Sequence, residues 1–218
     1  MLRTVTIVPA ILTADLQDFQ AQIARVGAFT KHIQIDITDG VFAKNRTLDI
    51  ANVAWPEGWT VDLHLMVSQP SKYLDTVMRL KPAMCIFHAE AGENLLPIFA
   101  GLKAGGIKAG VAMVPSTFPG RVKPYIDAAD HALIFAGQLG VQGSPADMMQ
   151  MEKIPIIRQM KQDISIGWDG GANMTNMRAL THADLDIINV GSAISRAPDP
   201  AAVYAEMVAE IDKTGVTL

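Results

Sequence analysis

The fold of this chain is decided by the stretch Ile33-Gln34-Ile35-Asp36-Ile37-Thr38-Asp39-Gly40, in which apolar and polar residues alternate before an Asp-Gly turn. Alternation with a period of two predicts a β-strand over about residues 32–38, with its isoleucines on one face. Gln34, Asp36 and Thr38 then share the other face. Burying polar side chains without a purpose is costly, so we expect this face to line a functional interior. A half-exposed strand of an open sheet is the alternative that this stretch leaves open.

Similar patterns recur along the chain. Further strands are expected at residues 4–10, 60–66, 84–88, 108–114, 132–136, 164–168 and 186–190. Helices are expected between them at about residues 16–26, 70–78, 95–104, 119–127, 144–161, 173–180 and 200–211, with a weak helical or irregular piece at 48–55. Eight strands that alternate with about eight helices require a parallel sheet. We therefore predict an α/β fold, a single (β/α)₈ TIM-barrel domain over residues 1–218 with eight parallel strands; an open doubly wound sheet is the alternative.

Composition excludes several classes of protein. The chain is 50% hydrophobic and 18% charged, which is ample for a large core and unlike a disordered protein. The net charge of −4 and the absence of a basic block argue against a nucleic-acid partner. No apolar run is long enough to span a membrane, and Pro9 and Asp15 interrupt the start of the chain too early for a signal peptide. The single Cys85 excludes an internal disulfide, so we expect a cytoplasmic protein.

Chemistry is expected where the predicted strands end, because working side chains in such barrels lie at the carboxyl ends of strands. Asp36 and Asp169 come from the carboxyl-terminal ends of the second and seventh strands, on different sides of the barrel mouth. Two carboxylates that face each other across a pocket can act as base and acid on opposite faces of a substrate carbon. His64, on the third strand beside Met66, could join both around a divalent metal ion. A histidine satisfied within the core is the common alternative.

Glycines follow the last strands of the predicted barrel. Gly170-Gly171 follows the seventh strand, Gly191-Ser192 follows the eighth, and a glycine-rich loop at residues 137–143 follows the sixth. The loops after strands seven and eight commonly hold a phosphate group, since glycine lets backbone N–H groups approach its oxygens. A Gly-Gly turn alone is weak evidence, because most are only turns, but the two positions together predict a phosphate site.

Six motifs, in order, resemble those of the ribulose-phosphate 3-epimerase family, over a region from about Pro9 to Ile194. They are Pro9-Ala10-Ile11-Leu12-Thr13-Ala14-Asp15, Ile35-Asp36-Ile37-Thr38-Asp39-Gly40, Asp62-Leu63-His64-Leu65-Met66-Val67, Phe87-His88-Ala89-Glu90, Trp168-Asp169-Gly170-Gly171 and Gly191-Ser192-Ala193-Ile194. The first is similar to the family's opening Pro-Ser-Ile-Leu-Ser-Ala-Asp, and the third matches its strand-three signature closely. Six motifs at the expected strand positions are far more specific than any one of them.

The resemblance implies an isomerase of the pentose phosphate pathway that interconverts D-ribulose 5-phosphate and D-xylulose 5-phosphate. Asp36 and Asp169 would be the acid and base: one removes the C3 proton, and the other returns a proton to the opposite face of a cis-enediolate. A divalent metal ion (Zn, Fe or Mn) held by Asp36, His64 and Asp169 would stabilise the developing oxyanion. The substrate would be bound by His64, Met66, Gly140, Gly170, Gly171, Gly191 and Ser192. The implied partner is a small phosphosugar, bound by a homo-oligomer that contacts neither nucleic acid nor membrane.

The chain departs from the family pattern around the pocket. Gln34 stands where the family has a fourth metal ligand, a histidine, and Ala10 replaces a serine. The segment 137–142 differs from the family's Pro-Gly-Phe-Gly-Gly-Gln, and Val114 stands where an asparagine precedes proline. These departures suit a divergent epimerase with altered metal use or substrate. The alternative is a non-catalytic phosphosugar-binding barrel that has lost its metal. A related sugar-phosphate decarboxylase fits worse, because Thr38 stands where its Asp-x-Lys-x-x-Asp motif requires lysine.

Overall fold

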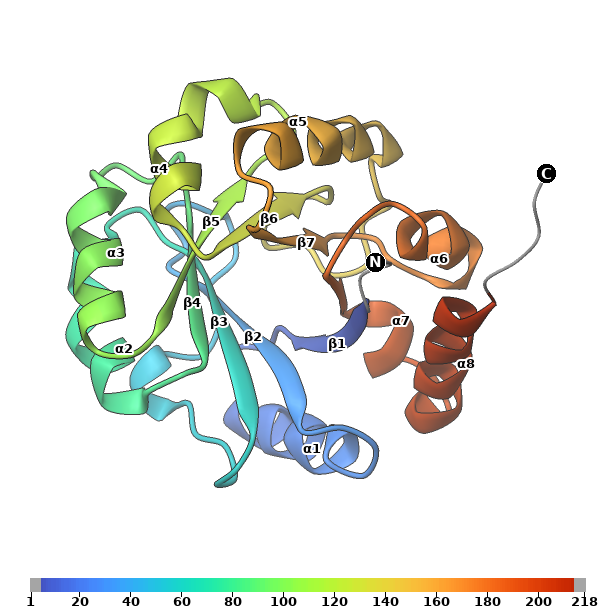
Figure 1. Ribbon diagram of the computed structural model, residues 1–218. Helices are drawn as coiled ribbons and strands as arrows, with labels where there is room; N and C mark the ends of the chain where they lie inside the picture. The colour runs from blue at the N-terminus through green and yellow to red at the C-terminus, as the bar shows by residue number, and fades with distance from the viewer. Residues whose placement is uncertain (1–4, 214–218) are drawn as a thin grey trace.

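Eight parallel strands close into one barrel in the computed structural model of the chain, which describes residues 5–213 (Figure 1). The strands are β1 (Thr6–Ile11), β2 (His32–Thr38), β3 (Thr60–Met66), β4 (Met84–His88), β5 (Lys108–Met113), β6 (His131–Phe135), β7 (Ser165–Asp169) and β8 (Ile187–Val190). They neighbour one another in sequence order, and β1 also pairs with β8. This closure confirms the predicted TIM barrel and excludes an open doubly wound sheet.

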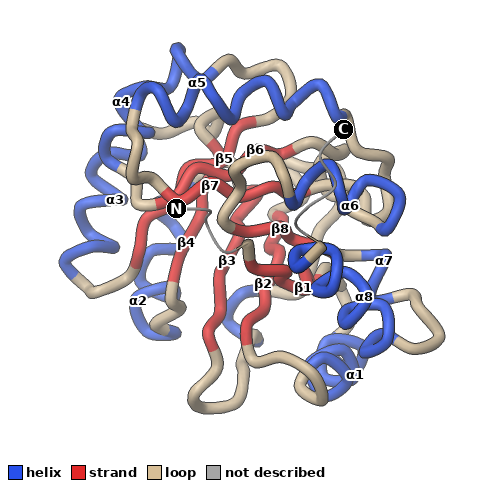
Figure 2. The backbone as a smooth tube through the Cα atoms, turned by 45° about the vertical axis from the view of Figure 1, so that its right-hand side comes forward, coloured by secondary structure: helices blue, strands red, loops and turns tan. Residues whose placement is uncertain are grey.

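The helices lie outside the ring of strands, as Figure 2 shows. They are α1 (Leu16–Val26), α2 (Leu74–Leu80), α3 (Leu95–Ala104), α4 (Lys123–Ala128), α5 (Lys153–Met160), α6 (Met174–Thr181), α7 (Ser192–Ser195) and α8 (Pro200–Asp212). Four 3₁₀ helices supplement them: η1 (Ile50–Asn52), η2 (Pro70–Tyr73), η3 (Pro119–Val122) and η4 (Met148–Glu152). Within residues 5–213, no helix has the length and apolar character needed to cross a membrane.

The strand faces divide as the alternating sequence predicts. Ile33, Ile35 and Ile37 of β2 are buried in the main apolar cluster, together with residues of the surrounding helices. A small second cluster of Met84, Ile86, Ala112 and Leu133 comes from the opposite faces of β4, β5 and β6. Because side chains alternate across a strand, Gln34, Asp36 and Thr38 point into the barrel and are nearly fully buried. The interior therefore combines an apolar cluster with a polar group of residues.

Several element boundaries differ from the prediction. The helix expected from residue 144 begins at Lys153, after η4, because the hydroxyl of Ser144 accepts a hydrogen bond from Gln138 N and holds this segment in the preceding loop. Strands β6 and β7 are displaced by one residue, and the short helix α7 was not expected. The expected start of the first strand at Thr4 lies outside the described residues, and β1 begins at Thr6.

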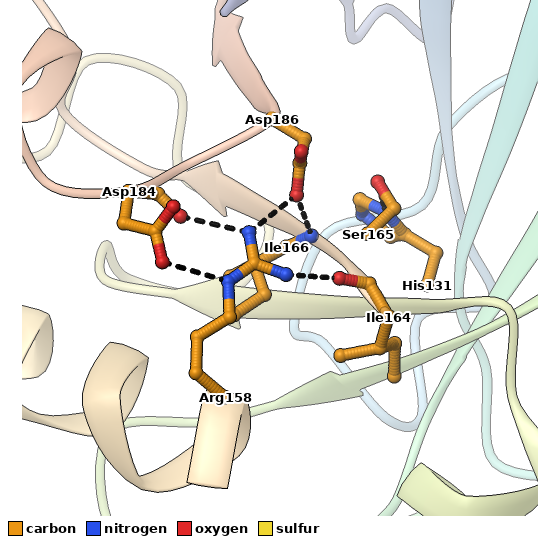
Figure 3. Close-up of polar contacts among 7 residues, drawn as sticks. All are labelled: His131, Arg158, Ile164, Ser165, Ile166, Asp184 and Asp186. Carbon is orange, nitrogen blue, oxygen red and sulfur yellow. Dashed lines mark hydrogen bonds and ion pairs between the residues drawn. The ribbon is translucent and has the colours of Figure 1, made fainter. Parts of the chain in front are cut away.

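Arg158 links helix α5 to the barrel (Figure 3). Its guanidinium donates to Asp184 Oδ2 at 2.9 Å, to Asp186 Oδ2 at 2.7 Å and to the carbonyl oxygen of Ile164. Asp186 Oδ2 also accepts the backbone N–H of Ile166 on β7, at 2.8 Å. One mostly buried cation thereby joins α5, β7 and the loop before β8.

Replacing Arg158 with methionine should lower the free energy of unfolding by about 2–3 kcal/mol, because hydrogen bonds to charged groups are lost from a mostly buried pair. Chemical denaturation of the purified variant measures the loss. Arg79→Met, at an exposed position on α2, is the matched control and should change stability by under about 0.5 kcal/mol. Equal stability of the two variants would contradict the structural role of Arg158.

Cys85 should be unreactive in the folded protein. It lies buried on β4, and burial raises the pKa of its thiol well above the ordinary value, so the reactive thiolate is scarce at neutral pH. A colorimetric thiol reagent should titrate one equivalent per chain in guanidinium chloride and almost none under native conditions. Native labelling at the rate of free cysteine would show that β4 opens readily.

Candidate active site

The structure brings Asp36 of β2 and Asp169 of β7 together inside the barrel. Each residue is only 8% exposed. The side-chain nitrogen of Gln34 bridges them, because it donates to Asp36 Oδ1 at 2.8 Å and to Asp169 Oδ2 at 2.6 Å. Two carboxylates that are more than a hundred residues apart in sequence therefore lie within reach of one small substrate.

His64 of β3 completes the cluster. It is the register partner of Asp36, so the two side chains lie side by side on the inner face of adjacent strands. Its Nδ1 atom lies 3.0 Å from Asp36 Oδ1 and 3.3 Å from Asp169 Oδ2. The ligand atoms of the three residues are all within 4.8 Å of one another. The three residues predicted to hold a metal ion are thus in one place.

Burial and the charges of the cluster shift the pKa values of Asp36 and His64. Burial raises the pKa of Asp36, and the negative charge of Asp169 raises it further, against the opposing hydrogen bonds from His64 and Gln34. Burial alone would lower the pKa of His64, but its hydrogen bonds to Asp169 and Asp36 outweigh burial and raise it to about 9. Without a bound metal ion, His64 therefore carries a proton that partly balances the two acids at neutral pH.

His88 fixes the orientation of His64. Its Nε2 atom lies 2.9 Å from Nε2 of His88, which closes β4. Burial and the neighbouring His64 lower the pKa of His88 to about 4, against the opposing effect of Glu90, so His88 is neutral. Because His64 is protonated and His88 is neutral, we assign the proton between the two rings to His64 Nε2, which leaves the proton of His88 on Nδ1. His64 Nδ1 is consequently the atom that faces the carboxylates.

A cleft opens above the two carboxylates. It is lined by Asp36, Asp169 and Met66 and by the predicted glycine loops, represented by Gly140, Gly170, Gly171, Gly191 and Ser192. His64 is fully buried beneath the carboxylates and does not line the cleft. All other predicted site residues do.

Some lining residues were not predicted to be in the site. Phe135, Gln142 and Ser144 line the cleft, and Ala10 lines it at the position where the family resemblance expects a serine. The Ser144-Pro145 pair predicts the start of a helix, and this pattern alone does not indicate a residue of the site. Phe135 ends β6, whereas the strand expected over residues 132–136 ends one residue later, so its last residue does not indicate Phe135.

His32 does not reach the cluster. Its Nε2 atom lies 2.8 Å from Asp62 Oδ2, one inward-facing position closer to the amino-terminal end of the barrel. It shares the strand face of Gln34 and Asp36, but its side chain is paired below them. Gln34 is therefore the residue of β2 that meets both carboxylates.

The glycines of the cleft allow close backbone contact. Gly170 and Gly171 have positive φ angles of 108° and 69°. A Cβ atom on Gly171 would lie 2.2 Å from the backbone nitrogen of Ala146, and one on Gly170 would lie 2.2 Å from the backbone nitrogen of Gly137. The loop after β7 thus packs directly on the segment after β6, and both positions require glycine.

Comparisons with known proteins identify relatives of this chain. A model of the ribulose-phosphate 3 epimerase family matches residues 6–195. A ribulose-phosphate 3-epimerase of Mycobacterium bovis is 28% identical over 211 residues, covering 92% of this chain and 90% of that protein. The cytoplasmic isoform of ribulose-phosphate 3-epimerase from Oryza sativa subsp. japonica is also 28% identical, over 92% of each chain. The structure of 3-hexulose-6-phosphate synthase from Salmonella typhimurium is 15% identical, with a TM-score of 0.73 over 97% of this chain and 100% of that one, which shows a shared fold.

Gly171→Ala should destabilise the protein far more than Gly58→Ala. Both glycines have a positive φ, but a Cβ at Gly58 would meet nothing within 4 Å, whereas one at Gly171 would meet backbone. We expect a loss of about 1 kcal/mol for Gly58→Ala and at least about 2 kcal/mol more for Gly171→Ala, measured by denaturation. Equal losses would show that the loop after β7 relaxes freely.

Proposed function

The chain belongs to the ribulose-phosphate 3-epimerase family and is an epimerase, and from this premise we propose that it interconverts D-ribulose 5-phosphate and D-xylulose 5-phosphate or a closely related ketose phosphate. The observation that carries the proposal is the meeting of Asp36 and Asp169 at the floor of an open cleft. Inverting one carbon requires a base on one face and an acid on the other.

In the proposed reaction, one carboxylate removes the C3 proton and the other, in its protonated form, delivers a proton to the opposite face of the planar cis-enediolate. The raised pKa of Asp36 supports this role, because a carboxyl group whose pKa is closer to neutral exchanges protons more efficiently than an exposed one. In the metal-free structure, the bridging amide of Gln34 holds the two carboxylates in position.

We place the substrate phosphate against the glycine loops after β7 and β8. Gly170, Gly171, Gly191 and Ser192 line one part of the cleft, where their backbone N–H groups and the serine hydroxyl could donate hydrogen bonds. No lysine or arginine is among the described residues that line the cleft. Held there, the phosphate would direct the rest of the sugar toward the carboxylates.

The residues fit a divalent cation. Two carboxylate oxygens and one imidazole nitrogen converge. His64 would lose its Nδ1 proton when it becomes a ligand, while Nε2 keeps the proton that lies toward His88. Asp36, His64 and Asp169 would hold the ion, which when bound supplies Lewis-acid stabilisation of the enediolate charge. His88 orients the imidazole, and the fully buried position of His64 excludes water from its far side.

We also propose that the protein acts in the cytoplasm on a small phosphosugar and forms a homo-oligomer. The single buried cysteine supports a reducing compartment, and one relative is named as a cytoplasmic isoform. A non-catalytic phosphosugar-binding barrel is the second candidate. The amide of Gln34 between the carboxylates, in the place of a charged or imidazole group, favours this alternative.

Asp36→Asn and Asp169→Asn should each lower kcat by about 10²–10⁴-fold, because each removes one partner of the proton exchange. A coupled assay with ribulose 5-phosphate and a six-carbon ketose phosphate measures turnover, and deuterium incorporation at C3 from D₂O reports each half-reaction. Asp62→Asn is the matched control: this interior aspartate is paired with His32 away from the cleft, so turnover should persist.

Absence of turnover by the wild-type protein on both substrates, with Zn²⁺, Fe²⁺ or Mn²⁺ supplied, would favour the binding-protein alternative. Retained turnover in either aspartate variant would remove that residue from the proposed mechanism.

A further inference from the structure

We propose that Gln34 selects the metal ion. When a divalent cation binds, its side-chain amide rotates by half a turn, and the amide oxygen becomes a fourth ligand. The resulting set of three oxygens and one nitrogen would favour Mn²⁺ relative to Zn²⁺. This inference rests on the proposed metal site of Asp36, His64 and Asp169.

The starting point is the asymmetric bonding of the Gln34 amide. The side chain is fully buried. Its nitrogen donates to both carboxylates, whereas its Oε1 atom is buried and has no hydrogen-bond partner among the described residues. A buried carbonyl oxygen without a partner is costly, and nothing at this end of the amide holds its orientation.

The two carboxylates alone explain the orientation. An amide oxygen placed 2.6–2.8 Å from two carboxylate oxygens would be repelled by both, so the N–H₂ group takes that place. A cation between the carboxylates reverses this preference, because an oxygen donates electrons to a cation and an N–H group does not. The two ends of the amide have nearly the same shape, so a half-turn exchanges them with little movement of the chain.

The spacing of the cluster suits this exchange. The position now taken by Gln34 Nε2 lies 2.6–2.8 Å from the carboxylate oxygens, and His64 Nδ1 lies 3.0 and 3.3 Å from the same two atoms. Adjacent ligand atoms in a six-coordinate site with bonds of about 2.1 Å are about 3.0 Å apart. After the half-turn, Oε1 would stand where a fourth ligand belongs.

The donor chemistry then sets the preferred ion. Carboxylate and amide oxygens are the ligands that suit Mn²⁺, whereas sites rich in imidazole or thiolate suit Zn²⁺. His64 contributes the only nitrogen ligand of the proposed set. Zn²⁺ binds most sites more tightly than Mn²⁺ in absolute terms, so the ratio of the two affinities is the quantity that Gln34 should control.

The test measures Mn²⁺ and Zn²⁺ binding to metal-free protein by calorimetry, without reference to activity. Gln34→Met removes the amide oxygen at similar volume and should weaken Mn²⁺ binding about tenfold or more. Gln34→His should shift the affinity ratio about tenfold or more toward Zn²⁺. Gln69→Met, at an exposed glutamine before η2, is the control and should leave both affinities unchanged.

A fourth variant covers the case in which Gln34→Met or Gln34→His does not fold. Gln34→Glu keeps an oxygen and adds a negative charge, so it should lower the thermal stability of the metal-free protein. Addition of Mn²⁺ should raise the melting temperature of this variant by more than it raises that of the wild type. A smaller rise in melting temperature with Mn²⁺ for Gln34→Glu than for the wild type overturns the proposal.

Nuclear magnetic resonance follows the half-turn directly. The side-chain N–H₂ signals of Gln34, identified by their loss in Gln34→Glu, should move upfield when diamagnetic Zn²⁺ saturates the site, since their protons leave the carboxylates. Unchanged signals at saturation, or equal metal affinities in Gln34→Met and the wild type, overturn the proposal. Neither result tests the proton-exchange roles of Asp36 and Asp169, which the turnover assay measures separately. A wild-type protein that binds neither ion also overturns it.

Discussion

The interior of this protein depends on one electrostatic constraint: two carboxylates are buried side by side and must be compensated. Asp36 and Asp169 would repel each other strongly in a medium of low dielectric constant. Gln34 donates to both, and His64 supplies a positive charge against both. His64 is in turn oriented by His88. The polar network is therefore a connected unit and not a set of separate contacts.

The barrel is what makes this network possible. Closure of β1 on β8 brings together β2 and β7, which are distant in sequence, so that only β1 and β8 lie between them on that side of the barrel. The register of β2 with β3 then places His64 beside Asp36, and the register of β3 with β4 places Ile86 beside His64, so that His88 reaches it from one inward-facing position further along β4. An error of one residue in either register would turn half of these groups toward the helices.

The sequence carries much of this arrangement, for identifiable reasons. The faces of β2 and β3 follow from their strict alternation, and the bounds of both strands agree with the prediction. The proximity of Asp36 and Asp169 follows once eight repeating units are recognised as a closed barrel. The contact between His64 and His88 could not be predicted, because it depends on side-chain rotation across two strands. The late start of α5 does not follow from the sequence, because Ser144-Pro145 also predicts a helix start, and only the folded loop shows that the Ser144 hydroxyl accepts a hydrogen bond from Gln138 N.

The residues that depart from the family pattern are not spread evenly over the cleft, and their positions indicate which part of the site differs. The two carboxylates that we propose to move the proton, Asp36 and Asp169, match the family pattern, as do the glycines whose backbone conformations the loops need. The changes fall on Gln34 and Ala10, which border the carboxylates and the cleft, and on the loop after β6. A protein that had lost catalysis would have no physical need to keep two mutually repelling buried acids with a bridging donor, since replacing one acid by an amide would relieve the repulsion. Their retention favours altered surroundings for an unchanged proton exchange.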